Sequence, residues 1–299
     1  MTEISAIIPT YNNEDVIGEC IQSLQNQTIP FDEIIVIDNN STDKTRDIAE
    51  NLGAKVYAIK SNRSEARNIG AKKSKSEILA FIESDSVYNK HWVEEVLKGF
   101  EKGYKCVIDR RAIYNPRTYI EKMGNAIFDM RYKNYKPFSI WAIKKDVFEE
   151  IGGFDENIEY SEDGDLGDRL LKEGYVIYFA KNAIQYHKGE PSTLREAMTR
   201  SWWAGLHAWQ YYNKYPEKVP YIKILLYTLM TISIIFPIVF LLIFASLYLF
   251  LFVNVINNME FKYAIIYPLY TILMRWPFYI GMIYTYFRKG FSKLNYKST

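Results

Sequence analysis

The sequence predicts an α/β protein, with helices flanking a mostly parallel sheet and transmembrane helices after it. Short apolar runs alternate with helical patterns over the first hundred residues, which is typical of strands joined by crossover helices. After Lys223 the chain becomes mostly aliphatic and aromatic, which indicates a lipid environment. The 299 residues are enough for one ordinary domain and a smaller module. We therefore expect a cytosolic domain over residues 1–220 and a membrane domain over residues 221–299.

Six apolar runs, bounded by turn-forming residues, are expected to be strands: Ile4–Ile8, Glu33–Ile37, Lys55–Ile59, Ile78–Ile82, Cys106–Asp109 and Val176–Ala180. Helical patterns lie between and after them, over Glu14–Gln25, Lys44–Leu52, Glu65–Lys73, His91–Glu101 and Leu166–Lys172. Glycines follow several of these patterns, as at helix ends. The segment Tyr114–Pro137 is expected to be a partly helical surface.

The apolar C-terminal part contains no charged residue from Ile224 to Met259. This run is longer than the ~20 residues that one crossing needs, and Pro237 divides it. We expect an interfacial or additional segment at 221–237, one span at about 238–256 and a second span at about 263–287. The first stretch is apolar on all sides, which disfavours the alternative of a buried hairpin in a soluble protein.

The charges around the apolar segments predict a topology. The tail carries Arg288, Lys289, Lys293 and Lys297, and such a basic tail belongs in the cytosol. No signal peptide pattern opens the sequence, and its two cysteines fit a reducing compartment. The expected location is therefore the cell membrane, with several spans and the N-terminal domain in the cytosol.

Polar residues follow the first two predicted strands. Pro9-Thr10-Tyr11-Asn12 ends the first, and the segment 38–43, Asp-Asn-Asn-Ser-Thr-Asp, ends the second. In open α/β sheets the carboxyl ends of the strands form the ligand site, and Asp38 and Asn39 offer acceptors and donors for a base or ribose. Taken alone, the second segment is more simply explained as a cap of the next helix. The two segments together favour a ligand site.

Phosphate recognition requires other residues, because neither a G-x-G-x-x-G nor a G-x-x-x-x-G-K-[ST] loop is present. Glu83-Ser84-Asp85 ends the apolar strand Ile78–Ile82 and brings two carboxylates to the same sheet edge. Carboxylates suit Mg²⁺ or Mn²⁺, which would neutralise a departing diphosphate. A net charge of +2 gives no sign of a nucleic-acid binder.

Five motifs occur in order, and together they resemble glycosyltransferase family 2, which has the GT-A fold with a Rossmann-like sheet. They are Pro9–Asn12, Val36–Asp43, Arg67-Asn68-Ile69-Gly70, Glu83-Ser84-Asp85 and Glu162-Asp163-Gly164-Asp165-Leu166. The resemblance covers residues 4–190. It implies a nucleotide-diphosphate sugar donor, a divalent metal and inversion at the anomeric carbon.

The resemblance also assigns roles at the donor site. The loop Pro9, Thr10, Tyr11 and Asn12 would contact the nucleotide, Asp38 and Asn39 the base, and Arg67 and Glu83 the surrounding region. Asp85 would hold the metal. Two residues depart from the family pattern: Glu83 replaces the first aspartate of the usual D-x-D, and Asn39 replaces the second aspartate of the earlier motif. The first change keeps a ligand, whereas the second weakens any inference about which base is bound.

On the acceptor side, the resemblance makes Glu162 and Asp163 the catalytic acidic pair, with Asp163 as the general base that deprotonates a hydroxyl. A phosphate acceptor, already ionised at neutral pH, needs no such base. Asp165 and Arg169 are more simply explained as a structural ion pair at helical spacing.

Two further residues are candidates by resemblance. His187 follows the last predicted strand, where similar enzymes place a histidine near the metal; a structural role is as plausible. Arg200 lies on a predicted helix before Trp202-Trp203, and membrane-bound relatives place an arginine and a tryptophan there. Arginine suits phosphate binding.

The leading hypothesis is an inverting, metal-dependent hexosyltransferase that moves sugar to a lipid-linked or glycan acceptor at the cytosolic membrane face. Its expected partners are a nucleotide-diphosphate sugar, that acceptor and membrane lipid, but no nucleic acid. A polyprenyl-phosphate sugar synthase is an alternative within the class. A catalytically silent nucleotide-binding module of the membrane is an alternative from another class.

Overall fold

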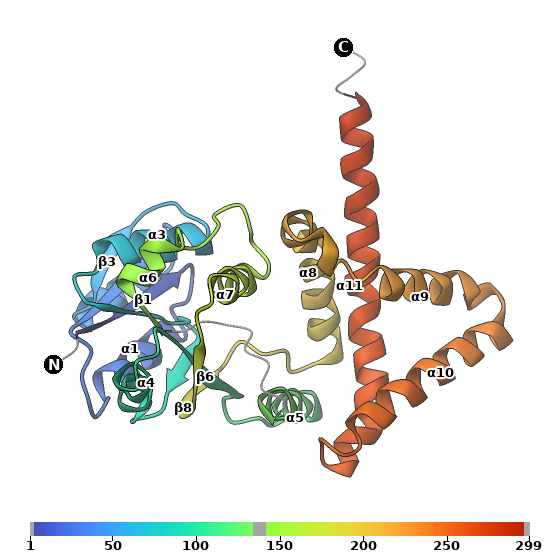
Figure 1. Cartoon of the computed structure of the whole chain (residues 1–299), viewed down its shortest axis with the longest axis horizontal. Helices are drawn as coiled ribbons and strands as arrows, with labels where there is room; N and C mark the ends of the chain where they lie inside the picture. Colours follow the sequence, from blue (N-terminus) through green and yellow to red (C-terminus); the bar gives the residue numbers. More distant parts are fainter. Residues whose placement is uncertain (1–2, 134–141, 296–299) are drawn as a thin grey trace. The chain divides into compact units, whose positions relative to one another are not determined.

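The computed structural model describes residues 3–133 and 142–295 of the chain. It forms two compact units, Met1–Pro116 with Asn134–Glu190, and Arg117–Lys133 with Pro191–Thr299. Figure 1 shows the helices and strands of both units. Each unit buries its own apolar side chains.

The first unit is built on one eight-stranded mixed sheet with the order β3-β2-β1-β4-β7-β6-β8-β5. Strands β3, β2, β1 and β4 are parallel, and β7 and β5 pair antiparallel with their neighbours. This confirms the predicted α/β class. The strands are β1 Ile4–Thr10, β2 Glu33–Asp38, β3 Lys55–Ala58, β4 Ile78–Phe81, β5 Ser86–Tyr88, β6 Cys106–Ile113, β7 Ala142–Lys144 and β8 Ile177–His187.

The parallel half of the sheet aligns the carboxyl ends of its strands. Thr10 pairs with Asp38, and Ile7 pairs with Phe81, so the residues that follow β1, β2 and β4 emerge at one edge. These strands are almost wholly apolar and buried, as expected of a sheet covered on both faces. The edge where the predicted motifs meet is therefore set by the core.

Helices connect and cover these strands: α1 Ile17–Gln25, α2 Thr45–Asn51, α3 Arg63–Lys73, α4 Trp92–Glu101, α6 Lys145–Glu150 and α7 Glu162–Lys172. Asn62 and Glu65 form a reciprocal capping box that fixes the start of α3. Gly70 lets α3 approach the sheet closely, because a Cβ there would lie 2.3 Å from Cγ2 of Ile7.

Strand β8 is longer than predicted, since Val176–Ala180 was expected and the strand runs to His187. It pairs with β6 on one side and with β5 on the other, and Ser86 lies opposite His187. The short strand β5, which no apolar run indicated, thus supplies the pairing that extends β8. This pairing brings His187 beside Asp85.

The second unit is helical, with α5 Tyr119–Lys133, α8 Leu194–Lys214, α9 Tyr221–Ile232, α10 Pro237–Val255 and α11 Phe261–Asn295, and short 3-10 turns η1 Pro216–Lys218 and η2 Ser233–Ile235. Helix α5 confirms that the Tyr114–Pro137 segment is partly helical, although residues 134–137 lie outside the described part of the chain.

Helices α8 and α11 pack with their backbones in contact. A Cβ at Gly205 would lie 2.1 Å from the Phe278 carbonyl oxygen, and one at Gly281 would lie 2.9 Å from that of Trp202. Trp209 Nε1 donates to the Met282 carbonyl at 2.7 Å. The predicted boundary after residue 220 therefore falls inside the second unit, because α8 packs against α11.

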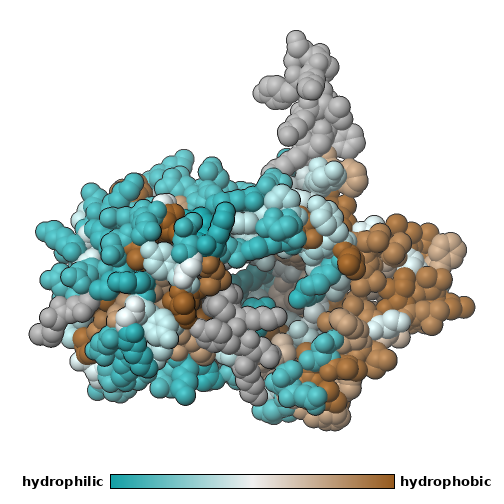
Figure 2. Space-filling view, viewed as in Figure 1, coloured by the Kyte–Doolittle hydropathy of each residue, from teal (hydrophilic) through white to brown (hydrophobic). Residues whose placement is uncertain are grey.

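Helix α10 is, in the described ranges, the one helix long and apolar enough to cross a membrane. It coincides with the first predicted span, and the shorter apolar stretch Tyr221–Ile235 precedes it. Figure 2 shows hydrophobic surface gathered over α9 and α10. The second predicted span lies within α11, which contains Arg275, Pro268 and Pro277 and is less apolar. A multi-pass topology is therefore not confirmed.

Candidate active site

Hydrogen bonds join the loops that follow β1 and β2. The Asn12 amide donates to Ser41 Oγ at 2.8 Å, and the Thr42 amide donates to Asn12 Oδ1 at 2.9 Å. Asn12 has a φ of 48°, a left-handed conformation that asparagine tolerates better than most residues. The sequence prediction paired these two segments, and the structure brings them together, with the Tyr11 side chain exposed beside them.

Asp38 is fully buried and holds the second loop in shape. Its carboxylate accepts from the Ser41 amide at 3.0 Å, from Ser41 Oγ at 2.5 Å and from Arg46 Nη2 at 3.1 Å. Asn39 Oδ1 accepts from the Ser61 amide at 3.0 Å. Both predicted base-binding side chains thus have structural partners. The start of α2 is held by Asp43, whose Oδ1 accepts from the Thr45 amide at 3.0 Å.

The loop after β1 is also bonded to the acidic motif after β4. The side-chain amide of Asn13 and the Ser84 hydroxyl form a hydrogen bond of 2.5 Å. The Thr10 hydroxyl at the end of β1 is buried and has no hydrogen-bond partner within the described residues. Three of the predicted motifs therefore meet at one edge of the sheet.

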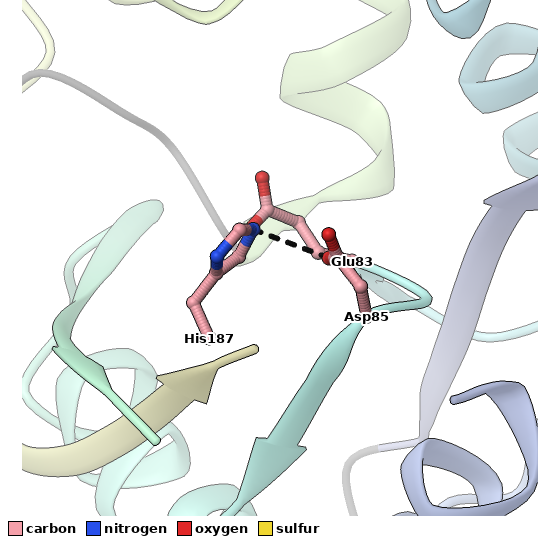
Figure 3. Close-up of side chains that lie close together, drawn as sticks. All are labelled: Glu83, Asp85 and His187. Carbon is pink, nitrogen blue, oxygen red and sulfur yellow. Dashed lines mark ion pairs between the residues drawn. The ribbon is translucent and has the colours of Figure 1, made fainter. Parts of the chain in front are cut away.

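Glu83, Asp85 and His187 form a cluster whose ligand atoms all lie within 4.8 Å of one another (Figure 3). His187 Nε2 lies 3.2 Å from Asp85 Oδ1 and 3.4 Å from Glu83 Oε2. The imidazole is buried, whereas the Asp85 side chain is 34% exposed. The cluster therefore presents one accessible carboxylate, supported from behind by a buried histidine and a second carboxylate.

Positive groups hold both carboxylates in their charged form. Burial alone would raise the pKa of Glu83, but Arg111 and His187 outweigh it and the pKa is lowered from 4.5. Burial opposes ionisation of Asp85 as well, yet the hydrogen bond and charge of His187 lower its pKa. Glu83 also accepts from Gln185 Nε2 at 2.7 Å. Both groups are thus available as anionic ligands at neutral pH.

Three residues that surround this cluster, Arg111, Gly189 and Glu190, were not predicted from the sequence. Arg111 lies 3.3 Å from Glu83 and 3.0 Å from Glu190. A Cβ at Gly189 would lie 2.4 Å from Asp85 Oδ2, so only glycine lets the chain pass this carboxylate without displacement. Gly189 follows His187 by two positions, and that spacing could have been noticed.

The acidic pair opens helix α7, after Ser161 in a left-handed conformation. Glu162 is buried and accepts from Arg67 Nη1 at 2.9 Å, and it lies 3.5 Å from Arg63. Arg67, which was expected to face the nucleotide, is therefore bound to Glu162. Asp163 is partly exposed, and its Oδ1 accepts from the Gly164 amide at 2.8 Å.

Asp165 and Arg169 form the structural ion pair predicted from their spacing. Arg169 Nη2 lies 2.8 Å from the buried Asp165 carboxylate. The guanidinium also donates to the carbonyls of Ile151 and Gly153, each at 2.6 Å. Arg200 lies on α8 in the second unit, whereas every other predicted site residue lies in the first.

Taken together, the first unit gathers a polar loop pair, an acidic cluster with a histidine, and a partly exposed aspartate at the start of α7. Carboxylates and imidazole are competent ligands for Mn²⁺, and carboxylates for Mg²⁺. Arg63 interacts electrostatically with Glu83, Glu162 and Asp163, which connects the acidic cluster to the α7 pair. This arrangement suits chemistry on a diphosphate.

Comparisons with known proteins agree with this arrangement. Residues 5–153 match the family model of glycosyl transferase family 2. The probable glycosyltransferase YdaM of Bacillus subtilis is 28% identical over 242 residues, which cover 72% of this chain and 56% of that protein. The O-antigen chain rhamnosyltransferase WbaN of Salmonella anatum is 30% identical over 210 residues, covering 62% of this chain and 66% of that protein.

Among solved structures, S. aureus TarS is similar, with a TM-score of 0.51, 20% identity, and coverage of 67% of this chain and 39% of that chain. This likeness concerns the fold alone. The chain spans between half and two thirds of the length of the two curated relatives. The family model, the relatives and the fold lead to one conclusion: the chain belongs to glycosyltransferase family 2 and has a GT-A-type fold.

Proposed function

We propose that the chain transfers a hexosyl group, with inversion, from a nucleotide-diphosphate sugar to a hydroxyl of a lipid-linked or glycan acceptor at the cytosolic membrane face. The observation that carries the proposal is the cluster of Glu83, Asp85 and His187 beside the hydrogen-bonded loops after β1 and β2. The loops offer polar groups for the nucleoside, and the cluster offers ligands for the metal of a metal–diphosphate complex.

The residues of the cluster fit Mg²⁺ or Mn²⁺. Asp85 is ionised and accessible, and His187 Nε2 points toward it. Glu83 is more enclosed and is held by Arg111 and Gln185. Asp85 and His187 would therefore be the ligands, with Glu83 as a supporting charge. When bound, the metal would neutralise the charge that develops on the departing diphosphate.

Asp163 is the proposed general base, because Glu162 is already engaged by Arg67. The Asp163 carboxylate takes the proton of the acceptor hydroxyl as its oxygen forms a bond to the anomeric carbon. The bond from that carbon to the diphosphate breaks on the opposite face, and the nucleoside diphosphate leaves with the electron pair. A single displacement of this kind inverts the anomeric centre.

The acceptor and the membrane location are inferred from two other observations. The relative WbaN is named an O-antigen chain rhamnosyltransferase. Helix α10 is apolar enough to cross a bilayer, and the surface of α9 and α10 is hydrophobic. An acceptor presented at the membrane is consistent with both.

The test is incubation of the full chain in detergent with a panel of nucleotide sugars, with and without Mn²⁺. We expect metal-dependent release of nucleoside diphosphate from one or two donors, and loss of metal-dependent nucleotide binding in Asp85→Asn. Asp47→Asn, an exposed aspartate on α2, is the matched control. Metal-independent binding of equal affinity in the wild type and Asp85→Asn would contradict the metal site. Failure to bind any nucleotide would contradict the proposed function.

A further inference from the structure

Arg275 is a partly buried cation among aromatic side chains in the second unit. Its Nη1 donates to the Tyr279 hydroxyl at 3.5 Å, and the other titratable groups that interact with it are the phenols of Tyr227 and Tyr267. No carboxylate pairs with it in the part of the chain that the structure describes. A guanidinium remains charged, and its partial withdrawal from water without an anion costs free energy. The position therefore suits an anion that the described residues do not supply.

The neighbours of Arg275 indicate the depth at which that anion would lie. Trp276 Nε1 donates to Thr231 Oγ1 near the end of α9 at 2.9 Å. The Trp276 ring lies 6.1 Å from that of Phe240, in the first turn of α10. The first turn of a membrane-spanning helix lies at the membrane–water interface, where tryptophan is also enriched. With α10 crossing the bilayer, Arg275 lies at the depth of the lipid phosphates.

The backbone that carries Arg275 is firmly held. The Ser201 hydroxyl donates to the carbonyl of Met274, the residue before Arg275. On the following turns, Gly205 and Gly281 allow the backbones of α8 and α11 to touch. Phe278 supplies the carbonyl at the first of these contacts. Because α11 is fixed on both sides of Arg275, the guanidinium is anchored at a defined position, which reduces the ordering cost of binding.

We propose that Arg275 binds the phosphate group of a membrane lipid, with the guanidinium as the charged donor. Arginine binds phosphate through two parallel hydrogen bonds, and such charge-assisted bonds are stronger than neutral ones. The inference deepens the proposed function, on whose membrane location it rests, by assigning a phosphate subsite for a lipid-linked acceptor. An ordinary phospholipid headgroup presents the same chemistry, so the test separates the two sources.

The experiment measures lipid affinity without any sugar donor. The full chain in detergent is titrated with phosphatidylcholine, phosphatidylglycerol and a long-chain isoprenyl monophosphate, and bound lipid is counted by native mass spectrometry. We expect Arg275→Gln to weaken phosphate-lipid binding by about tenfold or more. Arg288→Gln, an exposed arginine on the same helix, is the matched control and should leave it unchanged. Tyr279→Phe removes the hydroxyl that accepts a hydrogen bond from Arg275 and should change binding by less than about threefold.

A loss confined to the isoprenyl monophosphate supports the acceptor subsite, and an equal loss for phosphatidylglycerol supports a general headgroup site. Unchanged affinity of folded Arg275→Gln for all three lipids would overturn the proposal. If this variant fails to fold, Arg275→Lys tests the proposal instead. Lysine keeps the positive charge but cannot form two parallel hydrogen bonds to a phosphate. It should bind at least about threefold more weakly, and wild-type affinity would again overturn the proposal. Because the experiment measures no turnover, a negative lipid-binding result would not contradict the transferase proposal. An absence of sugar transfer would likewise not contradict lipid binding by Arg275.

Discussion

Arg67 donates to Glu162 at 2.9 Å, and both side chains are almost completely buried, with 3% and 7% exposed. The pair joins α3, which packs on the parallel half of the sheet, to the first residue of α7. Asp163 follows Glu162 directly in the sequence. The ion pair therefore holds the backbone beside the proposed general base in place. The guanidinium also lies 5.0 Å from the centre of the Phe154 ring.

Breaking this pair should destabilise the first unit. Arg67→Met leaves the buried Glu162 carboxylate with Arg63, at 3.5 Å, and loss of one partner of a buried pair costs about 3–5 kcal/mol. Arg63→Met is the matched control, because the Arg63 side chain is 59% exposed and its pairing is worth about 1 kcal/mol or less. Chemical unfolding followed by tryptophan fluorescence measures both. Equal effects of the two substitutions would contradict the structural role of Arg67.

Asp163→Asn should leave nucleotide affinity nearly unchanged and reduce transfer to a hydroxyl acceptor. Asparagine keeps the size of the side chain but cannot accept the proton, and general-base catalysis contributes about 10²–10⁴-fold. Nucleotide binding and transfer rate are measured side by side, with Glu173→Gln, an exposed residue just after α7, as the control.

The same variant distinguishes the two enzyme hypotheses. A phosphate acceptor carries its own negative charge, so a polyprenyl-phosphate sugar synthase should keep its rate in Asp163→Asn. Undiminished transfer would therefore remove Asp163 as the base and favour that alternative. A collapse of nucleotide affinity would instead assign Asp163 to the donor or metal site.

Gly189→Ala should impair metal binding more than stability. Its Cβ would lie 2.4 Å from Asp85 Oδ2 and 3.0 Å from His187 Cε1, so the carboxylate must move. Displacement of a ligand group should reduce metal affinity by about 10–100-fold. Calorimetric titration of Mn²⁺ with nucleoside diphosphate measures the effect. Gly167→Ala, where no atom lies within 4 Å, should bind as the wild type does. Wild-type affinity in Gly189→Ala would show that Asp85 does not need its present position.

Asp109 should make stability depend on pH. Burial raises its pKa from 3.8 to about 7, although Trp92 Nε1 donates to its Oδ2 at 2.8 Å. The folded state therefore binds more protons than the unfolded state between these values, and the contribution of Asp109 to stability falls as pH rises from about 4 to 7. Asp109→Asn should be more stable than the wild type at pH 8, on the order of 2 kcal/mol, with little difference at pH 4.

Thermal unfolding across this pH range measures the difference between Asp109→Asn and the wild type. Asp47→Asn, which changes an exposed aspartate, is the matched control. A constant difference between Asp109→Asn and the wild type at all pH values would contradict the raised pKa.

Much of the fold could be predicted from local patterns. The strands around Ile4, Glu33 and Ile78 are continuous apolar runs, and their observed bounds lie within two residues of those predicted. The order of the motifs predicted that Asp38 and Asp85 lie at one sheet edge. The register shows that β2, which ends at Asp38, and β4, which precedes Asp85, reach the same edge.

What escaped prediction depends on contacts between distant segments. Strand β5 has three residues, and it is defined by pairing with β8 rather than by its own pattern. No local pattern in the sequence indicates that Arg67 pairs with Glu162, which lies 95 positions away. Likewise, α8 resembles a terminal helix of the first domain until its glycine contact with α11 is known.

The contact between α8 and α11 also constrains the order of events during synthesis. Helix α8 ends at Lys214, and α11 begins only at Phe261, after α9 and α10 have been made. The face of α8 around Gly205 therefore has no partner when it leaves the ribosome. Until α11 follows, Trp202 and Trp209 remain uncovered on that face, a state in which chaperones or the bilayer surface must protect the nascent chain from aggregation.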